Sequence, residues 1–78
     1  MRDKEKSLLE KVQISDKLAF QKLFNTFHDQ LFHFIAYRVQ DGEIAKDIAQ
    51  ETFFRVWKNR KSLQPEKSFF SLLARIST

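Results

Sequence analysis

Few side chains in this 78-residue sequence have the types and spacing that catalysis requires. His28 and His33 lie five residues apart, which is poor helical spacing for two ligands of one metal, and no third ligand accompanies them. Asp47 and Glu51 are four residues apart, so a helix places them on one face, whereas catalytic carboxylate pairs face each other across a pocket. A single glycine excludes a glycine-rich phosphate loop. We therefore expect no enzyme, no metal and no cofactor, and we expect Asp47 and Glu51 to be helix-surface charges or partner contacts.

Charge is distributed unevenly along the chain. Residues 1–54 carry eight Lys and Arg against nine Asp and Glu, whereas residues 55–78 carry six against one. A basic last third favours a polyanionic partner at this end, although cations also stabilise helix C-termini, so a solvated helix end is the alternative. Cysteine is absent, which excludes disulfides and thiolate metal sites. No apolar run approaches the roughly 18 residues of a membrane span, so we expect a cytoplasmic protein without a membrane partner.

The elements that must position these residues are helices. Gly and Pro occur once each, which is too few for the turns of a sheet. Apolar residues recur at spacings of three and four, which is typical of helices with one buried face. The sequence therefore predicts an all-α fold, a small bundle of four to five helices that forms one domain over residues 1–78.

Two helices are predicted in the first half of the chain. Residues 3–13 carry a narrow apolar stripe, with Ile14 as its last member. Residues 15–16, Ser-Asp, are good N-cap residues for a second helix, which either runs on unbroken or breaks near residues 28–29. Gly42 is the strongest stop signal in the chain and the expected left-handed cap.

A third helix is predicted to begin near Glu43 and to fade at residues 60–62. Its polar residues lie outside the apolar stripe, so the helix has a second face that is either solvated or bound by a partner. The expected stripe consists of Ile44, Ala45, Ile48, Ala49, Thr52, Phe53 and Val56.

Residues 63–67 are predicted to form a loop, because Pro65 disfavours helix at the residue before it. A last helix opens at residues 65–66 or at Ser68 and carries Phe69, Leu72, Leu73 and Ile76 as its stripe. This pattern is interrupted at Thr78 without a cap signal, which indicates that the natural protein continues.

Three blocks of the sequence resemble one family. Residues 47–57, Asp-Ile-Ala-Gln-Glu-Thr-Phe-Phe-Arg-Val-Trp, resemble region 2.2 of bacterial RNA polymerase sigma factors of the extracytoplasmic-function (ECF) type. Residues 19–24, Ala-Phe-Gln-Lys-Leu-Phe, resemble region 2.1. Residues 65–76 resemble the family's Pro-x-x-Ser-Phe-x-x-Trp-Leu-x-x-Ile, with Leu72 where the family has Trp. The resemblance implies a sigma region 2 domain without the second domain that reads the −35 element.

Polymerase docking is the first function that the resemblance implies. In the family, the Asp and the Gln-Glu of region 2.2 contact the clamp helices of the polymerase β′ subunit, and this role falls on Asp47, Gln50 and Glu51. Carboxylates suit a basic partner helix, and an amide can both donate and accept across an interface. Phe54 and Arg55 are further expected contacts. Ordinary helix solvation is the alternative for all of these residues.

Promoter DNA is the second partner that the resemblance implies. In the family, the end of this helix, the next loop and the start of the next helix open the −10 element and hold a flipped base of the non-template strand. Arg55 and the basic residues beyond it are expected to neutralise phosphates. Trp57 and Phe69 are assigned to the core first, and the sequence does not select the residues that line the base pocket. The expected DNA-binding residues are Lys58, Asn59, Arg60, Lys61, Ser62, Gln64, Lys67 and Ser68.

Two alternatives stay open from the sequence. One is a helical interaction module whose main partner is an anti-sigma factor that masks the same face. The other is a small bundle of unrelated function.

Overall fold

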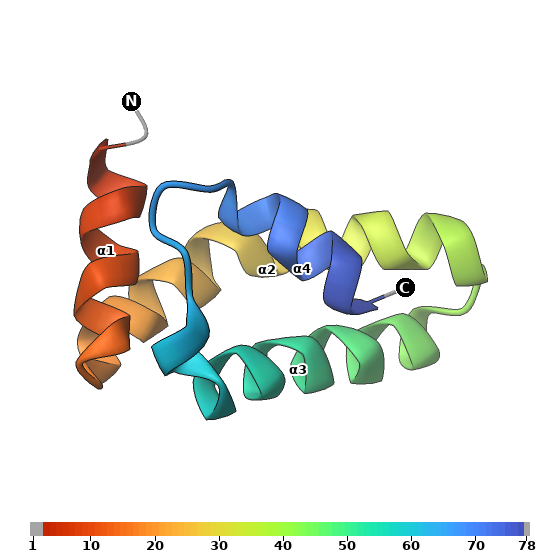
Figure 1. Cartoon of the computed structure of the whole chain (residues 1–78). Coiled ribbons are helices and arrows are strands. Elements are labelled where there is room, and N and C mark those ends of the chain that lie inside the picture. The colour runs from red at the N-terminus through yellow and green to blue at the C-terminus, as the bar shows by residue number, and fades with distance from the viewer. Residues whose placement is uncertain (1–2, 78) are drawn as a thin grey trace.

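Four α-helices and one short 3₁₀ helix follow one another in the computed structural model, which describes residues 3–77 (Figure 1). No strand occurs between residues 3 and 77, which confirms the predicted all-α bundle of four to five helices. The expected interruption at Thr78 lies outside the described residues. The elements are α1 (Asp3–Gln13), α2 (Lys17–Val39), α3 (Gly42–Lys58), η1 (Arg60–Ser62) and α4 (Phe69–Ser77).

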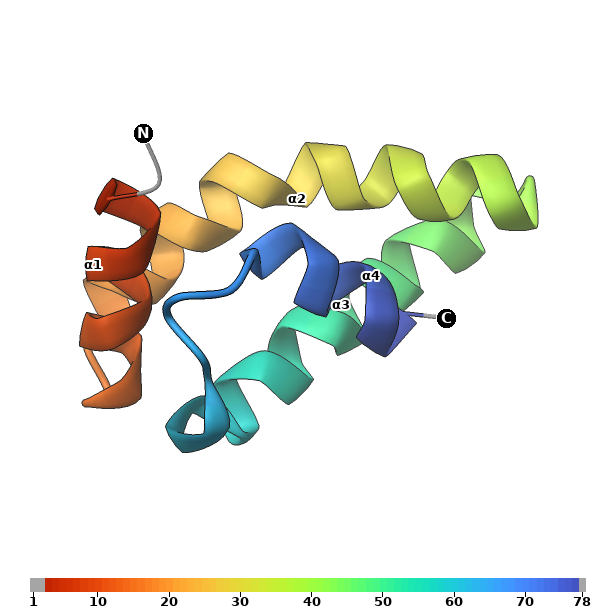
Figure 2. The same cartoon turned by 45° about the horizontal axis from the view of Figure 1, so that its top comes forward.

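The two long helices form a wedge that the last helix fills. From the short turn that joins them, α2 and α3 extend toward the same end of the molecule and diverge, and α4 packs against both (Figure 2). Helix α1 packs against α2 at the open end of the wedge, and the loop between η1 and α4 passes beside α1 in both views (Figures 1 and 2). The end of α3, this loop and the start of α4 therefore belong to one region of the molecule.

Aspartate side chains begin both long helices, and the sequence predicts the first of these two caps, at residues 15–16. Asp16 accepts hydrogen bonds from the backbone N–H groups of Leu18 and Ala19, at 3.0 and 3.1 Å. Asp41 does the same for the second and third residues of α3 at the same distances. Each carboxylate satisfies two of the backbone donors that a helix N-terminus leaves open. Helix α2 continues without a break through residues 28–29.

The left-handed residue between α2 and α3 is Gln40, so the prediction of Gly42 as the cap was wrong. Gln40 has φ 55°, and its N–H donates to the carbonyl of Ala36 at 2.8 Å. Asp41 must adopt an extended conformation to cap α3, so the left-handed residue is the one before it, Gln40. Gly42 then becomes the first residue of α3. A non-glycine residue at positive φ is strained by roughly 1 kcal/mol or more, which the Ala36 hydrogen bond offsets in part.

The core lies where all four α-helices meet, and Phe53 is at its centre. Its ring lies 4.7 Å from that of Phe24 and 6.4 Å from those of Phe20 and Phe69, measured between centroids. Along α3 the stripe is mostly as predicted, because Ala45, Ala49, Thr52, Phe53 and Val56 are buried and Ile48 is half-buried. The buried Thr52 hydroxyl donates to the Ile48 carbonyl at 2.7 Å, and no buried side-chain N or O atom within residues 3–77 lacks a hydrogen-bond partner.

Some residues predicted in the apolar stripes are exposed instead, Ile14 and Ile44 most of all. Ile14 follows the last residue of α1 and is 80% exposed in the turn to α2. Ile44 is 49% exposed in the first turn of α3. There the wedge is narrow, and the small side chain of Ala45 occupies the buried position, which leaves the larger Ile44 at the edge.

Candidate functional site

The exposed side of α3 brings together all five residues predicted to bind the polymerase. We call this surface the docking face; each of its side chains is exposed, and together they follow the i, i+3, i+4, i+7 spacing of one helix face. The opposite side of the helix is the buried stripe, so the helix cannot turn without exposing its core residues. The docking face consists of Asp47, Gln50, Glu51, Phe54 and Arg55.

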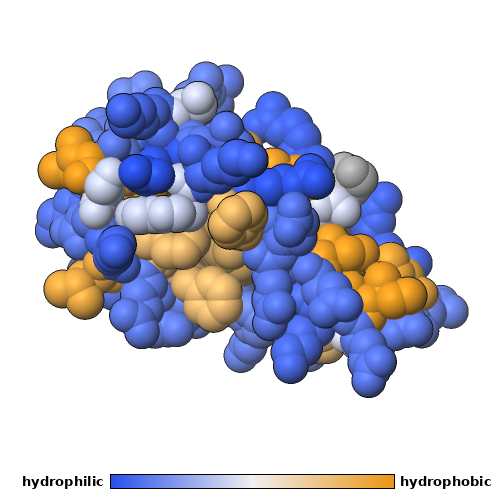
Figure 3. Space-filling model, turned by 90° about the horizontal axis from the view of Figure 1, so that it is seen from below, coloured by the Kyte–Doolittle hydropathy of each residue, from blue (hydrophilic) through white to orange (hydrophobic). Residues whose placement is uncertain are grey.

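Phe54 is the apolar centre of the docking face. Its side chain is 60% exposed, although the neighbouring Phe53 is buried. Figure 3 shows this side of the molecule, where apolar areas are separated by hydrophilic side chains. The docking face thus combines one exposed aromatic side chain with carboxylates, an amide and a guanidinium.

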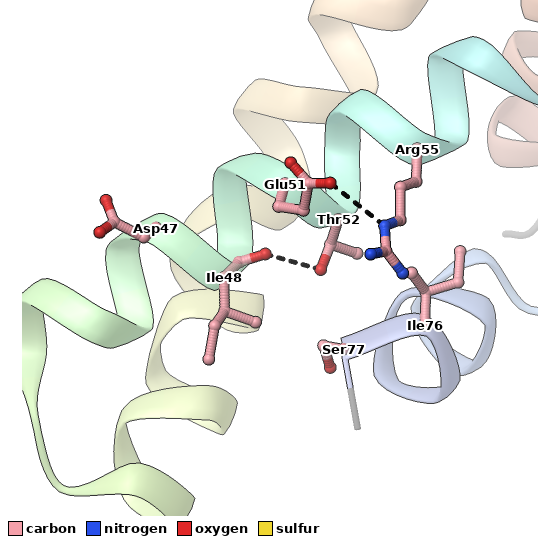
Figure 4. Close-up of a pocket in the computed structure, with 7 residues that line it drawn as sticks. All are labelled: Asp47, Ile48, Glu51, Thr52, Arg55, Ile76 and Ser77. Carbon is pink, nitrogen blue, oxygen red and sulfur yellow. Dashed lines mark hydrogen bonds and ion pairs between the residues drawn. The ribbon is translucent and has the colours of Figure 1, made fainter.

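A groove between α3 and α4 borders the docking face (Figure 4). It has a volume of about 480 Å³ and is lined by Asp47, Ile48, Glu51, Thr52 and Arg55 of α3, and by Ile76 and Ser77 of α4. The Nε of Arg55 donates to Glu51 at 3.2 Å, and both side chains are more than half exposed. Such an exposed pair contributes little to stability, so both groups can exchange partners at low cost.

The residues predicted to bind DNA form the end of α3 and the following loop. We call residues 59–68 the basic loop. The η1 turn is closed by a hydrogen bond from the N–H of Ser62 to the carbonyl of Asn59 at 2.9 Å. A second turn, around Pro65, is closed by a hydrogen bond from the N–H of Lys67 to the carbonyl of Gln64 at 2.9 Å. Ser68 then accepts from the N–H of Ser71 at 3.2 Å and begins α4.

Two hollows lie along the basic loop. One, of about 380 Å³, is lined by Lys58, Asn59, Arg60, Lys61 and Ser62. The other, which we call the loop pocket, has a volume of about 230 Å³ and an apolar floor beneath polar residues. Its lining residues are Ser62, Leu63, Gln64, Lys67, Ser68, Phe69, Leu72 and Arg75. The predicted residues are thus contiguous in space, and the loop pocket adds Leu63, Leu72 and Arg75, which were not among the predicted DNA-binding residues.

Besides Ser68, two more of the predicted DNA-binding side chains already have partners in the protein. Asn59 donates from Nδ2 to the carbonyl of Arg55 at 3.0 Å and so caps the end of α3. Arg60 donates from Nε to the Ser15 hydroxyl at 2.8 Å and from one terminal nitrogen to the carbonyl of Trp57 at 3.0 Å. Its guanidinium also lies 4.4 Å from the centre of the Trp57 ring. In contrast, the side chains of Lys61 and Lys67 form no hydrogen bond or ion pair within residues 3–77.

The aromatic residues near the loop belong to the core, as expected. Phe69 is buried, and Trp57 is half-buried against Phe20, with the ring centroids 5.1 Å apart. Leu72, at the position of the family's Trp, is half-buried in the floor of the loop pocket.

Neither histidine belongs to a metal site within the described residues. His28 is half-buried against the rings of Phe24 and Phe53, and His33 is exposed. Residues 3–77 contain no group of three or more His, Asp or Glu side chains placed to hold a metal ion. Within the same residues, no helix has the length and hydropathy needed to cross a membrane.

Comparison with known proteins identifies one family. The model of the sigma-70 region 2 family matches residues 23–77, which is most of the chain. The RNA polymerase sigma-H factor of Pseudomonas aeruginosa is 29% identical over 75 residues, which are 96% of this chain and 39% of that protein. The ECF sigma-E factor of Haemophilus influenzae is 29% identical over 73 residues, which cover 94% of this chain and 38% of that protein.

A third relative is the ECF sigma factor SigX of Bacillus subtilis, which is 32% identical over 59 residues, or 72% of this chain and 30% of that protein. No solved structure matches the chain significantly. The chain spans less than two fifths of the length of each of these relatives. The family match and the relatives agree with the blocks recognised in the sequence, and the chain belongs to the sigma-70 region 2 family, with relatives among the ECF sigma factors.

Proposed function

We propose that this chain is the part of an ECF sigma factor that docks on core RNA polymerase in the cytoplasm and binds the opened −10 element of a promoter. The observation that carries the proposal is that α3 presents two distinct surfaces. The docking face lies along its length, and the basic loop follows directly from its end. The role is one of binding, and it requires no catalytic residue.

The docking face has the chemistry that a basic, helical partner requires. Asp47 and Glu51 provide acceptors for Lys and Arg, and Gln50 can both donate and accept. Phe54 offers an exposed apolar surface between them, which desolvates the polar contacts at an interface. The clamp helices of the β′ subunit are the partner that we assign to this face.

The loop pocket is the candidate site for the flipped base of the non-template strand. Leu63, Phe69 and Leu72 give it an apolar floor against which a base can pack, while Ser62, Gln64 and Ser68 supply hydrogen-bonding groups at its rim. Lys61 and Lys67 are available for the flanking phosphates. Stacking on aromatic rings has a smaller role here, because Phe69 is buried and Trp57 is covered by Arg60.

Binding to isolated β′ clamp helices tests the docking assignment. We expect the double change Gln50→Ala and Glu51→Lys to weaken binding about tenfold or more, because it removes an amide contact and reverses a charge at the centre of the face. The matched control is Gln21→Ala with Glu10→Lys, since both residues are exposed on other helices and the substitutions are identical. Equal binding by the two double variants would show that the docking face is elsewhere.

A regulator that masks the docking face is the second candidate partner, and the open α3–α4 groove favours it. The groove offers Ile48 and Ile76 beside Glu51 and Arg55, a mixed surface that fits an amphipathic helix of an anti-sigma factor. Such a regulator should compete with the clamp helices for this chain. Simultaneous binding of both partners would contradict the shared surface.

A further inference from the structure

Three polar contacts tie helix α1 to the basic loop, although α1 lies outside the residues that the family model matches. The Ser15 hydroxyl, just after α1, accepts from Arg60 Nε at 2.8 Å. Gln13 donates from Nε2 to the carbonyl of Leu63 at 2.7 Å. Glu5 accepts from the backbone N–H of Phe69 at 3.0 Å. These contacts join residues that are 45, 50 and 64 positions apart in the sequence.

The contacts are spread over the whole loop rather than gathered at one point. Arg60 stands at its beginning, Leu63 at its middle and Phe69 immediately after its end. Figures 1 and 2 both show the loop running beside α1 over this distance. The Leu63 carbonyl and the Phe69 N–H have no partner in a regular helix ladder, so α1 supplies the partners that the loop backbone needs.

Ser15 is placed for this contact by an unusual backbone conformation. Its φ is 69°, in the left-handed region, and the turn that results directs the chain from α1 into α2. The guanidinium of Arg60 is held between the Ser15 hydroxyl, the Trp57 carbonyl and the Trp57 ring. The start of the loop is therefore fixed to both α1 and α3.

The residues that hold the loop differ from those available to a ligand. Gln13 and Glu5 contact the loop through its backbone, so the side chains of Gln64, Lys61 and Lys67 remain uncommitted within residues 3–77. We propose that Glu5, Gln13 and Ser15 are positioning residues, through which α1 holds the basic loop in the conformation that binds single-stranded DNA. This inference rests on the DNA-binding function proposed above.

Two single changes test the inference without disturbing the core. Gln13→Met keeps the side-chain length and removes the donor to Leu63. Ser15→Gly keeps the left-handed conformation and removes the hydroxyl. The matched controls are Gln30→Met, at an exposed position of α2, and Gln40→Gly, at the other left-handed residue.

Hydrogen–deuterium exchange of the loop amides is the first readout. The N–H groups of Ser62, Leu63 and Lys67 are hydrogen-bonded within the loop, so their exchange reports its opening. We expect Gln13→Met and Ser15→Gly to speed this exchange about fivefold, the effect of one lost hydrogen bond, while the amides in the middle of α2 and α3 stay as protected as before. The controls should leave the loop unchanged.

Binding of a labelled single-stranded −10 oligonucleotide is the second readout. We expect Gln13→Met and Ser15→Gly to lose affinity for this oligonucleotide about fivefold as well. Affinity should recover in Ser15→Asn, because Asn tolerates positive φ and its side-chain oxygen can accept from Arg60. Trp57 is the only tryptophan, so its fluorescence should shift in Ser15→Gly and return in Ser15→Asn.

The possible results separate this inference from the function on which it rests. Faster loop exchange with weaker DNA binding supports the positioning role. Unchanged DNA binding by both variants overturns it and leaves the DNA function intact. A wild-type chain that binds no single strand overturns the DNA function, and the contacts of α1 are then structural only.

Discussion

The salt dependence of single-strand binding follows directly from which loop cations are free. The ammonium groups of Lys61 and Lys67 have no partner within residues 3–77 and are exposed, so each can neutralise a phosphate. Arg60 is different, because its guanidinium already donates to Ser15 and Trp57. We therefore expect the double change Lys61→Gln and Lys67→Gln to alter the salt dependence, and Arg60→Gln to alter it much less.

The size of the effect can be worked out from the number of phosphates neutralised, since each neutralised phosphate releases bound counterions. Each phosphate that a protein neutralises on a single strand contributes about −0.7 to the slope of log affinity against log salt. Loss of two such contacts should make the slope shallower by about 1.4. Between 50 and 200 mM KCl, the affinity advantage of the wild-type chain over the double variant should then shrink by roughly sevenfold.

Fluorescence anisotropy of a labelled oligonucleotide at several KCl concentrations measures this slope. The control is Lys22→Gln with Lys46→Gln, which removes the same charge from exposed positions outside the loop. Charges farther than about 10 Å from the strand are largely screened at 0.1 M salt, so the control should keep the wild-type slope. An unchanged slope in the loop variant, or an equal change in the control, would refute the assignment of phosphate contacts to Lys61 and Lys67.

Four further predictions concern stability, each checked by denaturant unfolding of the chain. Phe53→Ala should lose about 3–5 kcal/mol, because the buried ring packs against three other phenylalanine rings, and a loss below 1 kcal/mol would contradict its central place. Asp41→Ala should lose about 1 kcal/mol with its two capping hydrogen bonds, and no change would contradict the cap. Gln40→Gly should gain roughly 1 kcal/mol by relieving the left-handed conformation, and a loss would contradict the assigned strain. Glu51→Ala should change stability by less than about 0.5 kcal/mol, since its ion pair with Arg55 is exposed, and a large loss would assign Glu51 to the fold rather than to docking.

Helix positions were predictable from the sequence because local signals agree along most of the chain. Asp16 and Asp41 stand at the starts of the two long helices, and the apolar spacing of α3 matches its buried face. Each of these signals involves residues within a few positions of one another. Periodicity alone could not place Ile44, since only the convergence of α2 and α3 decides which side chain at the narrow end is buried.

The candidate site was predictable in part. Features set by the geometry of one helix could be predicted, whereas contacts between distant parts of the chain could not. The exposure of residues proposed for docking, such as Glu51 and Phe54, follows from helical geometry, because one face of α3 is buried and they lie on the other. The fixation of Arg60 on Ser15 and Trp57 was not predictable, since it depends on a turn that lies 45 residues earlier. The loop pocket was likewise hidden, because Leu72 and Arg75 reach it only once α4 packs into the wedge.

A rigid connection between the two proposed sites is the main consequence of this fold. Asp47 and Lys58 are eleven residues apart on one α-helix, which corresponds to roughly 16 Å along its axis. Because the buried stripe of α3 extends through Val56, the helix cannot bend or rotate between them without disrupting the core. Binding of the docking face to the polymerase would therefore place the beginning of the basic loop at a fixed distance from the polymerase. The contacts from α1 would extend this control to the rest of the loop, so that the phosphate-binding lysines and the loop pocket meet the strand in one arrangement.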